Sequence, residues 1–302
     1  MYVQSENIIT AYAKVNLNLE VLNLREDGYH NIFSVMAHIE LNDLLKLDKF
    51  VIKEFSGIEI NIKPTEGSFS NIIEELPVEE NLIFKAAQEL SVKLNKTFQA
   101  NFSICKNIPA GAGLGGGSAD AAAALTLLYK AMDIPFLDIM DLAANIGADA
   151  PFALCEGAAI CEGIGEKITQ LAVTLPHFVL LINNGDHIDT RWAYKTLNRS
   201  SEFNIDDDYI IQKKEKIQKA FNAKKWNDFF DLCTNDFEEN VFNKYPKIAF
   251  AKEELIKNGA DFSIMTGSGS TMIGLFSDED RANIVFEKMR NTNKWVYLTK
   301  FV

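Results

Sequence analysis

The chain of 302 residues is 47% hydrophobic and 24% charged, which is ordinary for a globular protein and enough for one large domain or two medium ones. Its formal net charge of −12 at pH 7 argues against nucleic-acid binding, which needs a basic face, so no nucleic-acid partner is expected. An acidic protein can still bind a nucleotide if backbone N–H groups, a helix N-terminus or a metal ion supply the positive charge.

The sequence gives no sign of a membrane or secretory segment. No apolar run approaches the ~18 residues of a membrane-spanning helix, and residues 1–19 alternate polar and apolar side chains, unlike a secretory signal. The four cysteines form no C-x-x-C pair, and the four histidines form no H-E-x-x-H motif. We therefore expect free thiols, no metal site built from protein ligands, no membrane partner and a cytoplasmic location.

Strand patterns dominate the first hundred residues. Apolar and polar residues alternate over 14–21, which predicts a strand with Lys14 and Asn16 on its polar face, and residues 25–28 form a turn. Downstream, the patterns predict strands over 31–41, 44–55, 58–62 and 98–108, and a helix over 80–94.

A glycine-rich loop follows the last of these strands. Five glycines lie within seven positions and lead into an alanine-rich helix, predicted to begin near the capping candidates Ser118 and Asp120. Glycine permits positive φ and lets backbone amides approach phosphate oxygens, while the helix adds its positive dipole end. The loop therefore predicts a polyphosphate cradle. A plain glycine turn is disfavoured by the number of glycines.

Two familiar nucleotide motifs fail at this loop. A Walker A motif needs lysine where the chain has Gly117. A dinucleotide fingerprint can be aligned with Gly111, Gly113 and Gly116, but it expects a second parallel strand ending in an acidic residue ~20 positions further on. In this chain, the positions at that distance lie within or just after the predicted helix and not at the end of a second strand.

The rest of the sequence contains patterns of both helices and strands. A helix over 136–147 precedes a turn over 147–152, a strand is predicted over 177–183, and residues 261–276 read as strand, tight glycine turn and strand. The fold class is α+β and not a doubly wound sheet. Near residue 160 the sequence changes to strand patterns that alternate with charged helices. This change predicts two domains, 1–160 and 161–302.

Five segments, in family order, resemble the GHMP kinases: residues 11–30, 109–125, 146–152, 156–166 and 265–276. The resemblance implies a two-domain GHMP kinase fold, with an N-terminal ATP-binding domain like domain 2 of ribosomal protein S5. Its C-terminal domain would be a ferredoxin-like α/β sandwich.

Three elements within these segments are similar to the diphosphocytidyl-methylerythritol kinase family in particular: A-K-x-N-L-x-L, R-x-D-G-Y-H and G-A-D-x-P-F. The chain departs from that family's usual pattern at Tyr12, Ala150 and Thr266.

The resemblance implies ATP-dependent phosphorylation of the 2-hydroxyl of 4-diphosphocytidyl-2-C-methyl-D-erythritol, with ATP as co-substrate and Mg²⁺ on its phosphates. Asp149 would accept the proton of the hydroxyl, and Lys14 would hold the hydroxyl and offset charge on the transferring group. Without the resemblance, Asp149 reads as a turn or capping residue and Lys14 as a solvated strand lysine.

The same resemblance assigns the ATP contacts. Asn81 would lie near the adenine, and Ser118 could reach a phosphate or Mg²⁺. The phosphate cradle would comprise Pro109, Ala110, Gly111, Ala112, Gly113, Leu114, Gly115, Gly116, Gly117, Ser118 and Ala119.

The acceptor contacts are assigned to other segments. Tyr29 and His30 would recognise cytosine, one by stacking and the other by hydrogen bonding. Tyr194 is the candidate for the second face of the base, with Trp192 as its competitor. The remaining substrate contacts would be Asn16, Gly267 and Ser268.

Three rival functions stay open. The same fold could phosphorylate another alcohol, such as homoserine or mevalonate, although the Asp27-Gly28-Tyr29-His30 element argues against this. A non-catalytic nucleotide-binding regulator would be expected to lack Lys14 or Asp149. A nicotinamide oxidoreductase is disfavoured by the context of the loop. We expect a monomer or weak homodimer.

Overall fold

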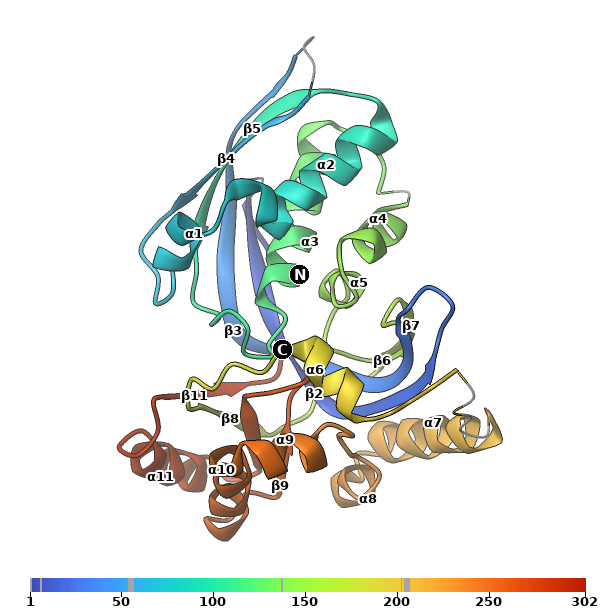
Figure 1. The fold of residues 1–302 in the computed structure, drawn as a ribbon. Helices are drawn as coiled ribbons and strands as arrows, with labels where there is room; N and C mark the ends of the chain where they lie inside the picture. Colours follow the sequence, from blue (N-terminus) through green and yellow to red (C-terminus); the bar gives the residue numbers. More distant parts are fainter. Residues whose placement is uncertain (1, 6, 54–56, 137, 202, 204–206) are drawn as a thin grey trace. The chain divides into compact units, whose positions relative to one another are not determined.

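The computed structural model of the chain describes residues 2–5, 7–53, 57–136, 138–201, 203 and 207–302 (Figure 1). The described strands are β1 (Tyr2–Ser5), β2 (Ile8–Leu24), β3 (His30–Ile52), β4 (Glu59–Pro64), β5 (Phe98–Cys105), β6 (Ala158–Gly163), β7 (Lys167–Leu171), β8 (Phe178–Asn183), β9 (Phe262–Met265), β10 (Met272–Phe276) and β11 (Trp295–Lys300).

Helices separate many of these strands. The described helices are α1 (Asn71–Glu75), the 3-10 helix η1 (Val78–Glu80), α2 (Leu82–Leu94), α3 (Gly116–Ala131), α4 (Ile139–Ile146), α5 (Ala150–Ala153), α6 (Thr190–Thr196), α7 (Asp207–Asn222), α8 (Trp226–Phe230), α9 (Glu238–Lys244), α10 (Pro246–Lys257) and α11 (Glu279–Met289). This order confirms the predicted mixture of helices and strands.

The chain forms two compact units, each built from three segments that are not contiguous in the sequence. The first unit comprises Met1–Lys14, Leu41–Ala110 and Gly115–Glu156, and the second comprises Val15–Glu40, Gly111–Leu114 and Gly157–Val302. Strands β2 and β3 each contribute residues to both units. The division into 1–160 and 161–302 stays a prediction, and the last change of unit along the chain falls between Glu156 and Gly157.

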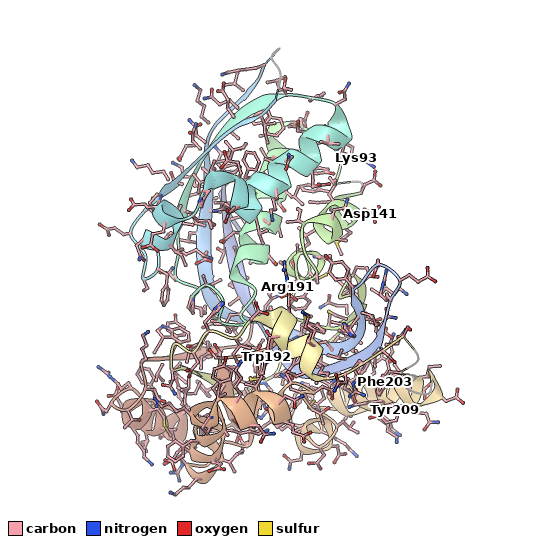
Figure 2. All side chains as sticks on the ribbon, viewed as in Figure 1. Lys93, Asp141, Arg191, Trp192, Phe203 and Tyr209 are labelled. Atoms are coloured by element: carbon pink, nitrogen blue, oxygen red, sulfur yellow. The ribbon has the colours of Figure 1, made fainter. Side chains whose placement is uncertain are left out.

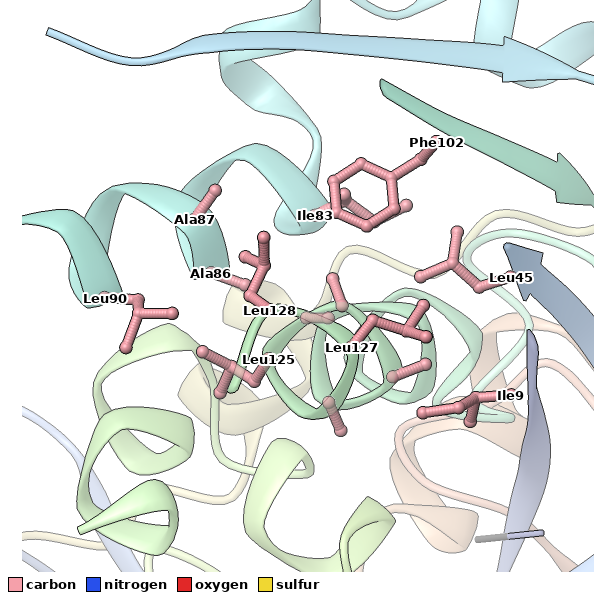
Figure 3. Packing of buried hydrophobic residues seen from close by; sticks show 14 of the residues in the cluster. Ile9, Leu45, Ile83, Ala86, Ala87, Leu90, Phe102, Leu125, Leu127 and Leu128 are labelled. Carbon is pink, nitrogen blue, oxygen red and sulfur yellow. The ribbon is translucent and has the colours of Figure 1, made fainter. Parts of the chain in front are cut away.

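The core of the first unit lies between a sheet and two packed helices. Residues of β3 from Leu44 to Ile52 pair antiparallel with β5, which pairs parallel with β4. Helix α2 buries Ile83 and Leu90 against α3, and Phe102 of β5 closes the cluster from the sheet side (Figure 3). The alternating burial along β5 confirms the strand predicted over 98–108 as far as Cys105, where the strand ends.

Helix α3 is the central element of this core. Its run from Ala121 to Ala124 is fully buried, because methyl side chains let neighbouring elements approach a helix from every side. Leu125 and Leu128 continue the buried surface toward α2 (Figure 3). The alanine-rich segment therefore forms a helix that is surrounded by packed neighbours. The N-terminus of this helix follows the glycine loop.

The second unit contains a four-stranded antiparallel sheet in the order β11-β8-β10-β9. Helix α10 packs on β10, where Leu255 lies against Gly274, and a Cβ at that glycine would lie 2.7 Å from Leu255 Cδ2. The antiparallel pairing of β9 with β10 confirms the strand–turn–strand prediction for residues 261–276. In the same unit, Ile32–Ala37 of β3 pairs with β6, which pairs with β7.

The polar residues of β2 are buried, in contrast to the solvated face that alternation commonly indicates. Lys14, Asn16 and Asn18 are at most 6% exposed. Buried polar groups need hydrogen-bond partners. Asn18 donates from its amide to the carbonyl oxygen of Phe33, and its own side-chain oxygen accepts from the backbone N–H of Thr234. Alternation correctly predicted the strand, while burial of its polar side depends on segments far along the chain.

His38 makes the free energy of unfolding depend on pH. Burial lowers the pKa of this imidazole from 6.5 to about 3, and its side chain is 3% exposed. Below pH 6.5 the unfolded state therefore binds a proton that the folded state rejects, so stability falls as the pH decreases from 6.5 toward 3. We expect the His38 contribution to cost about 2 kcal/mol at pH 5 relative to pH 8.

Urea unfolding at these two pH values tests this expectation. In His38→Gln the stability at pH 5 relative to pH 8 should rise by about 2 kcal/mol over the native value, while in His187→Gln, whose imidazole is exposed, it should stay native. Burial also lowers the pKa of His177, so a smaller dependence persists. An unchanged pH dependence in His38→Gln would refute the assignment.

Candidate active site

Asp149 and Lys14 meet in the first unit. Lys14 Nζ lies 3.3 Å from Asp149 Oδ2, with side-chain exposures of 8% and 30%. Asp149 is the N-cap residue of α5, but its side chain makes no capping hydrogen bond. The carboxylate is therefore paired with a lysine and partly open to solvent, which is a different environment from that of an ordinary capping aspartate.

The glycine loop leads into α3 without a side-chain cap. The N-cap residue is Gly115, at φ +69°, and α3 begins at Gly116. The helix thus begins close to Ser118, as predicted, but the prediction that Ser118 or Asp120 caps it is wrong: Ser118 lies in the first turn, and Asp120 pairs with a buried lysine. Backbone N–H groups at an uncapped helix start are free to bind an anion.

Lys14 packs directly against this helix start. A Cβ on Gly115 would lie 2.8 Å from Lys14 Cγ, so any side chain at this position would displace the lysine. Ser118 lies close to the turn that carries Asp149, because a Cβ on Gly147 would lie 3.7 Å from Ser118 Oγ. The first unit thus brings together Lys14, Asp149, Ser118 and the first residues of α3.

Asn81 stands at the start of the neighbouring helix. It is the N-cap of α2, and its side-chain oxygen accepts a hydrogen bond of 2.9 Å from the backbone N–H of Ile83. The next residue, Leu82, lies within 3.3 Å of the place where a Cβ on Gly117 would be. The starts of α2 and α3 are therefore adjacent, and contact of Asn81 with adenine stays a prediction.

In the second unit, the C-terminal glycine turn holds the tip of the glycine loop. Thr266 donates from its hydroxyl toward the carbonyl oxygen of Gly113 at 3.3 Å and accepts from the backbone N–H of Asn16 at 2.9 Å. Asn235 donates from its side-chain amide to the carbonyl oxygens of Met265 and Gly267. The Thr266 hydroxyl, at a position where the family commonly has serine, therefore links the loop tip to β2.

Asn16 is embedded in this network. It is 1% exposed, and its side-chain amide donates to the Ser34 hydroxyl at 2.9 Å. Ser34 in turn donates to the carbonyl oxygen of Asn18. The predicted contact of Asn16 with the acceptor or with phosphate is not tested by this geometry. The geometry does show that the Asn16 side chain is held in place.

Gly113 is a position where the backbone excludes every side chain. It has φ +77°, and a Cβ there would lie 2.5 Å from the carbonyl oxygen of Thr266. We expect Gly113→Ala to raise the KM for ATP by at least about ten-fold, because the loop tip must move away from Thr266. Initial rates at varied ATP measure this effect.

Gly57→Ala is the matched control for Gly113→Ala. Gly57 has φ +99°, and among the described residues no atom lies within 4 Å of the Cβ it would gain. It therefore suffers the backbone strain of a left-handed conformation without the collision. A KM for ATP that changes equally in both variants would contradict the role of the Gly113 contact.

Two of the aromatic residues assigned to the base, His30 and Tyr194, lie together in the second unit. The rings of His30 and Tyr194 stack with centroids 5.1 Å apart, and His30 Nε2 lies 3.2 Å from the carbonyl oxygen of Arg199. A base inserted between two rings needs about 7 Å, two successive contacts of ~3.5 Å. The base therefore does not fit between His30 and Tyr194 as they stand.

Tyr29 and Trp192 occupy contrasting positions. Tyr29 is 60% exposed, which leaves its ring available to stack on a ligand. Trp192 lies on α6, where Figure 2 labels it. It has the ammonium of Lys244 3.8 Å from its ring centre and meets Tyr245 edge-on. The ring in contact with His30 is that of Tyr194.

Gly267 and Ser268 form the predicted tight turn. Gly267 has φ +61° and approaches Gly113, since a Cβ on Gly267 would lie 3.4 Å from Gly113 Cα. The Ser268 hydroxyl lies 3.1 Å from that of Thr190, the first residue of α6. The turn thus connects the loop tip with the helix that carries Tyr194.

A magnesium ion carried by ATP is compatible with these residues. Among the described residues, no group of three or more His, Cys, Asp or Glu side chains could hold a metal ion. Mg²⁺ is commonly bound by one or two protein oxygens together with substrate phosphates and water. The Ser118 hydroxyl of α3, which lies near the turn that carries Asp149, could supply a protein oxygen of this kind.

The sequence did not reveal several residues that organise the site. Thr266 and Asn235 act through contacts with distant segments, and His187 lies against Gly111, where a Cβ would be 3.5 Å from Nδ1. Lys106 lies between β5 and Pro109, close to the glycine loop along the chain, but nothing in the sequence predicted its partners.

Comparison with known proteins defines the class of protein to which this chain belongs. Residues 81–157 match the GHMP kinases N terminal domain, and residues 217–294 match the GHMP kinases C terminal domain. Among solved structures, homoserine kinase from Cytophaga hutchinsonii has a TM-score of 0.72 at 14% identity, covering 100% of this chain and 97% of its own. The fold is the two-domain GHMP kinase fold.

Full-length relatives narrow the class further. The 4-diphosphocytidyl-2-C-methyl-D-erythritol kinase of Clostridium botulinum (strain Eklund 17B) is 34% identical over 302 residues, covering 97% of this chain and 99% of the relative. A crystal structure of 4-(cytidine 5'-diphospho)-2C-methyl-D-erythritol kinase has a TM-score of 0.72 at 28% identity, covering 97% of this chain and 98% of its own. The chain belongs to the 4-diphosphocytidyl-2-C-methyl-D-erythritol kinase family.

Proposed function

We propose that this chain transfers the γ-phosphoryl group of ATP to the 2-hydroxyl of 4-diphosphocytidyl-2-C-methyl-D-erythritol, in the non-mevalonate pathway to isoprenoid precursors. The observation that carries the proposal is the 3.3 Å contact between Lys14 and Asp149, beside the uncapped start of α3. A non-catalytic regulator on the same fold has no need of such a pair.

Asp149 is assigned as the general base. The hydroxyl oxygen forms a bond to the γ-phosphorus while the bond from that phosphorus to the β,γ-bridging oxygen breaks, and ADP leaves. Asp149 accepts the hydroxyl proton. Its 30% side-chain exposure leaves the carboxylate accessible to an acceptor, and its contact with Lys14 fixes its orientation.

Lys14 is assigned to positioning and charge stabilisation. The Lys14 side chain is buried, with its carbon stem against Gly115 and its ammonium at Asp149, so it needs little reorganisation as charge develops on the transferring group. The N–H groups of the first turn of α3 are assigned to the ATP phosphates. Mg²⁺, carried with ATP, would shield phosphate charge, with Ser118 as a candidate ligand.

The cytosine is assigned to Tyr29, His30 and Tyr194. The exposed ring of Tyr29 offers one stacking face, and Tyr194, backed by His30 and by Phe237 edge-on at 4.9 Å, offers a second. His30 lies beside Tyr194 and can present its ring edge to the base. Asn16, Gly267 and Ser268 complete the proposed acceptor contacts.

The cellular setting is also a proposal. Cys105, Cys155, Cys161 and Cys233 are free thiols, which fits the reducing cytoplasm. No helix in the described part of the chain is long and apolar enough to cross a membrane. We propose that the protein works as a monomer or weak homodimer.

A panel of acceptors tests the function. ADP release is followed with ATP and 4-diphosphocytidyl-2-C-methyl-D-erythritol, with mevalonate and homoserine as alternative acceptors. Turnover with the cytidine acceptor alone is expected. Turnover only with mevalonate or homoserine would retain the kinase and overturn the assignment of Tyr29 and His30. Folded protein that binds ATP and turns over none of the three would overturn the function.

A further inference from the structure

A buried lysine lies between two buried carboxylates in the first unit. Lys106 Nζ lies 2.8 Å from Asp120 Oδ2 and also contacts Asp43 Oδ2. The three side chains are at most 5% exposed. None of them belongs to the residues assigned above to the transfer step or to the acceptor.

The three residues come from elements of the first unit that lie at the two ends of the glycine loop. Asp43 lies in β3, Lys106 directly follows β5, and Asp120 lies near the start of α3. The second carboxylate oxygen of Asp43 accepts backbone N–H groups of Asn107 at 2.5 Å and Ile108 at 2.9 Å. Asp43 therefore fixes the backbone that enters the loop, immediately before Pro109.

Lys106 reaches the other end of the loop. A Cβ on Gly116, the first residue of α3, would lie 3.0 Å from Lys106 Nζ and 2.8 Å from Ile108 Cγ2. The lysine thus joins the entry of the loop, through Asp43, to the helix start, through Asp120. Ordering a glycine-rich segment costs conformational entropy, and holding both of its ends in place reduces that cost when a ligand binds.

The charges of the cluster favour a proton on Asp120. One ammonium faces two carboxylates, and Asp43 uses both of its oxygens. Among the described residues, Asp120 Oδ1 has no hydrogen-bond partner. Burial, together with the Asp43 carboxylate, holds the pKa of Asp120 well above its usual range. A protonated Asp120 leaves the cluster neutral, so the nearby polyphosphate site is spared a buried negative charge.

We propose that Lys106 is a positioning residue for the glycine loop. It holds the two ends of this loop together through Asp43 and Asp120 and so sets the affinity for ATP. The proposal rests on the proposed function only in taking ATP as the ligand. It requires no contact between Lys106 and the nucleotide.

Lys106→Met tests the proposal through ATP binding. Calorimetric titration with a non-hydrolysable ATP analogue is expected to give a Kd at least about ten-fold weaker than that of the native chain. In rate measurements, the KM for ATP should rise while the KM for the cytidine acceptor stays unchanged. A native ATP affinity in Lys106→Met would overturn the proposal.

Lys213→Met is the matched control. Lys213 Nζ lies 2.9 Å from Glu20 Oε2 in the second unit, and both side chains are at most 9% exposed. This variant also leaves a carboxylate buried without its lysine, so a lower melting temperature is expected. Its ATP affinity should stay native. Equal losses of ATP affinity in both lysine variants would reduce Lys106 to a stability element.

Two variants at Asp120 keep the proposal falsifiable if Lys106→Met does not fold. Asp120→Asn resembles the protonated acid and keeps an acceptor for Lys106, so its ATP affinity should stay close to native. Asp120→Leu fills a similar volume without an acceptor and should bind ATP at least about ten-fold more weakly. Native affinity in Asp120→Leu would contradict the proposal. The titration needs no acceptor, so it succeeds or fails independently of the acceptor assignment.

Discussion

Replacing Asp149 by Asn is expected to lower kcat by about 10² to 10⁴-fold while leaving ATP binding and the melting temperature close to native. The amide has the shape of the carboxylate and can still contact Lys14, but it cannot accept the proton of the acceptor hydroxyl. Because the Asp149 side chain makes no capping hydrogen bond, its replacement removes none from α5. Initial rates at saturating ATP and acceptor measure the change.

The chain offers a close control for this variant. Asp138 is the N-cap residue of α4, its side chain also makes no capping hydrogen bond, and it pairs with Lys93 at 3.2 Å. The Lys93 side chain is labelled in Figure 2. Asp138→Asn should therefore keep native kcat. Near-native turnover in Asp149→Asn would remove the general-base assignment.

Replacing Lys14 by Met is expected to lower kcat by about 10² to 10³-fold, the usual cost of removing one preorganised charged or hydrogen-bonding group from a transition state. The methionine stem preserves packing against Gly115, where Lys14 Cγ lies 2.8 Å from a would-be Cβ. The loss therefore reports the ammonium and not the shape of the site. Lys93→Met, which breaks the pair at Asp138, should have no such effect.

The double variant of Lys14 and Asp149 distinguishes a working pair from two separate residues. Residues that act as a unit lose much less together than the product of their single losses. We expect the double variant to be only slightly slower than the slower single variant. If Lys14→Met instead raises the KM for ATP at unchanged kcat, Lys14 is a binding residue and not part of the transfer step.

Local patterns predicted most of the elements that carry the site. Alternation identified β2, and glycine density followed by alanines identified the loop and α3. These features are encoded within ten to twenty neighbouring residues, and their physical causes are equally local. The same patterns suggested Ser118 and Asp120 as capping residues of α3, whereas the N-cap residue is Gly115, which has no side chain to cap the helix.

The pairing of Lys14 with Asp149 could be expected only from the family resemblance. Each residue alone has an ordinary reading, as a strand lysine or as a turn aspartate. Their contact depends on β2 and the turn before α5 being brought together by the packing of the first unit. Composition and spacing contain no information about such a distance.

Hydrogen-bond and ion-pair networks between distant segments could not be predicted from the sequence either, because composition and spacing do not show which distant segments meet. The bond of Thr266 to the Gly113 carbonyl oxygen and the joining of Asp43 to Lys106 each connect segments that are far apart along the chain. His30 was assigned a direct role with Tyr29, and the structure adds its stack with Tyr194. These contacts set orientation, which is the part of a site that sequence patterns describe least.

Phosphorus-31 NMR of the reaction mixture tests the central claim most directly. With ATP, Mg²⁺ and 4-diphosphocytidyl-2-C-methyl-D-erythritol, we predict ADP together with a new phosphomonoester on the acceptor, whose diphosphate signals persist. Mass spectrometry should show one added phosphoryl group, and carbon couplings should place it at the 2-hydroxyl. Inorganic phosphate beside an unchanged acceptor, or a phosphoryl group at another hydroxyl, would contradict the account.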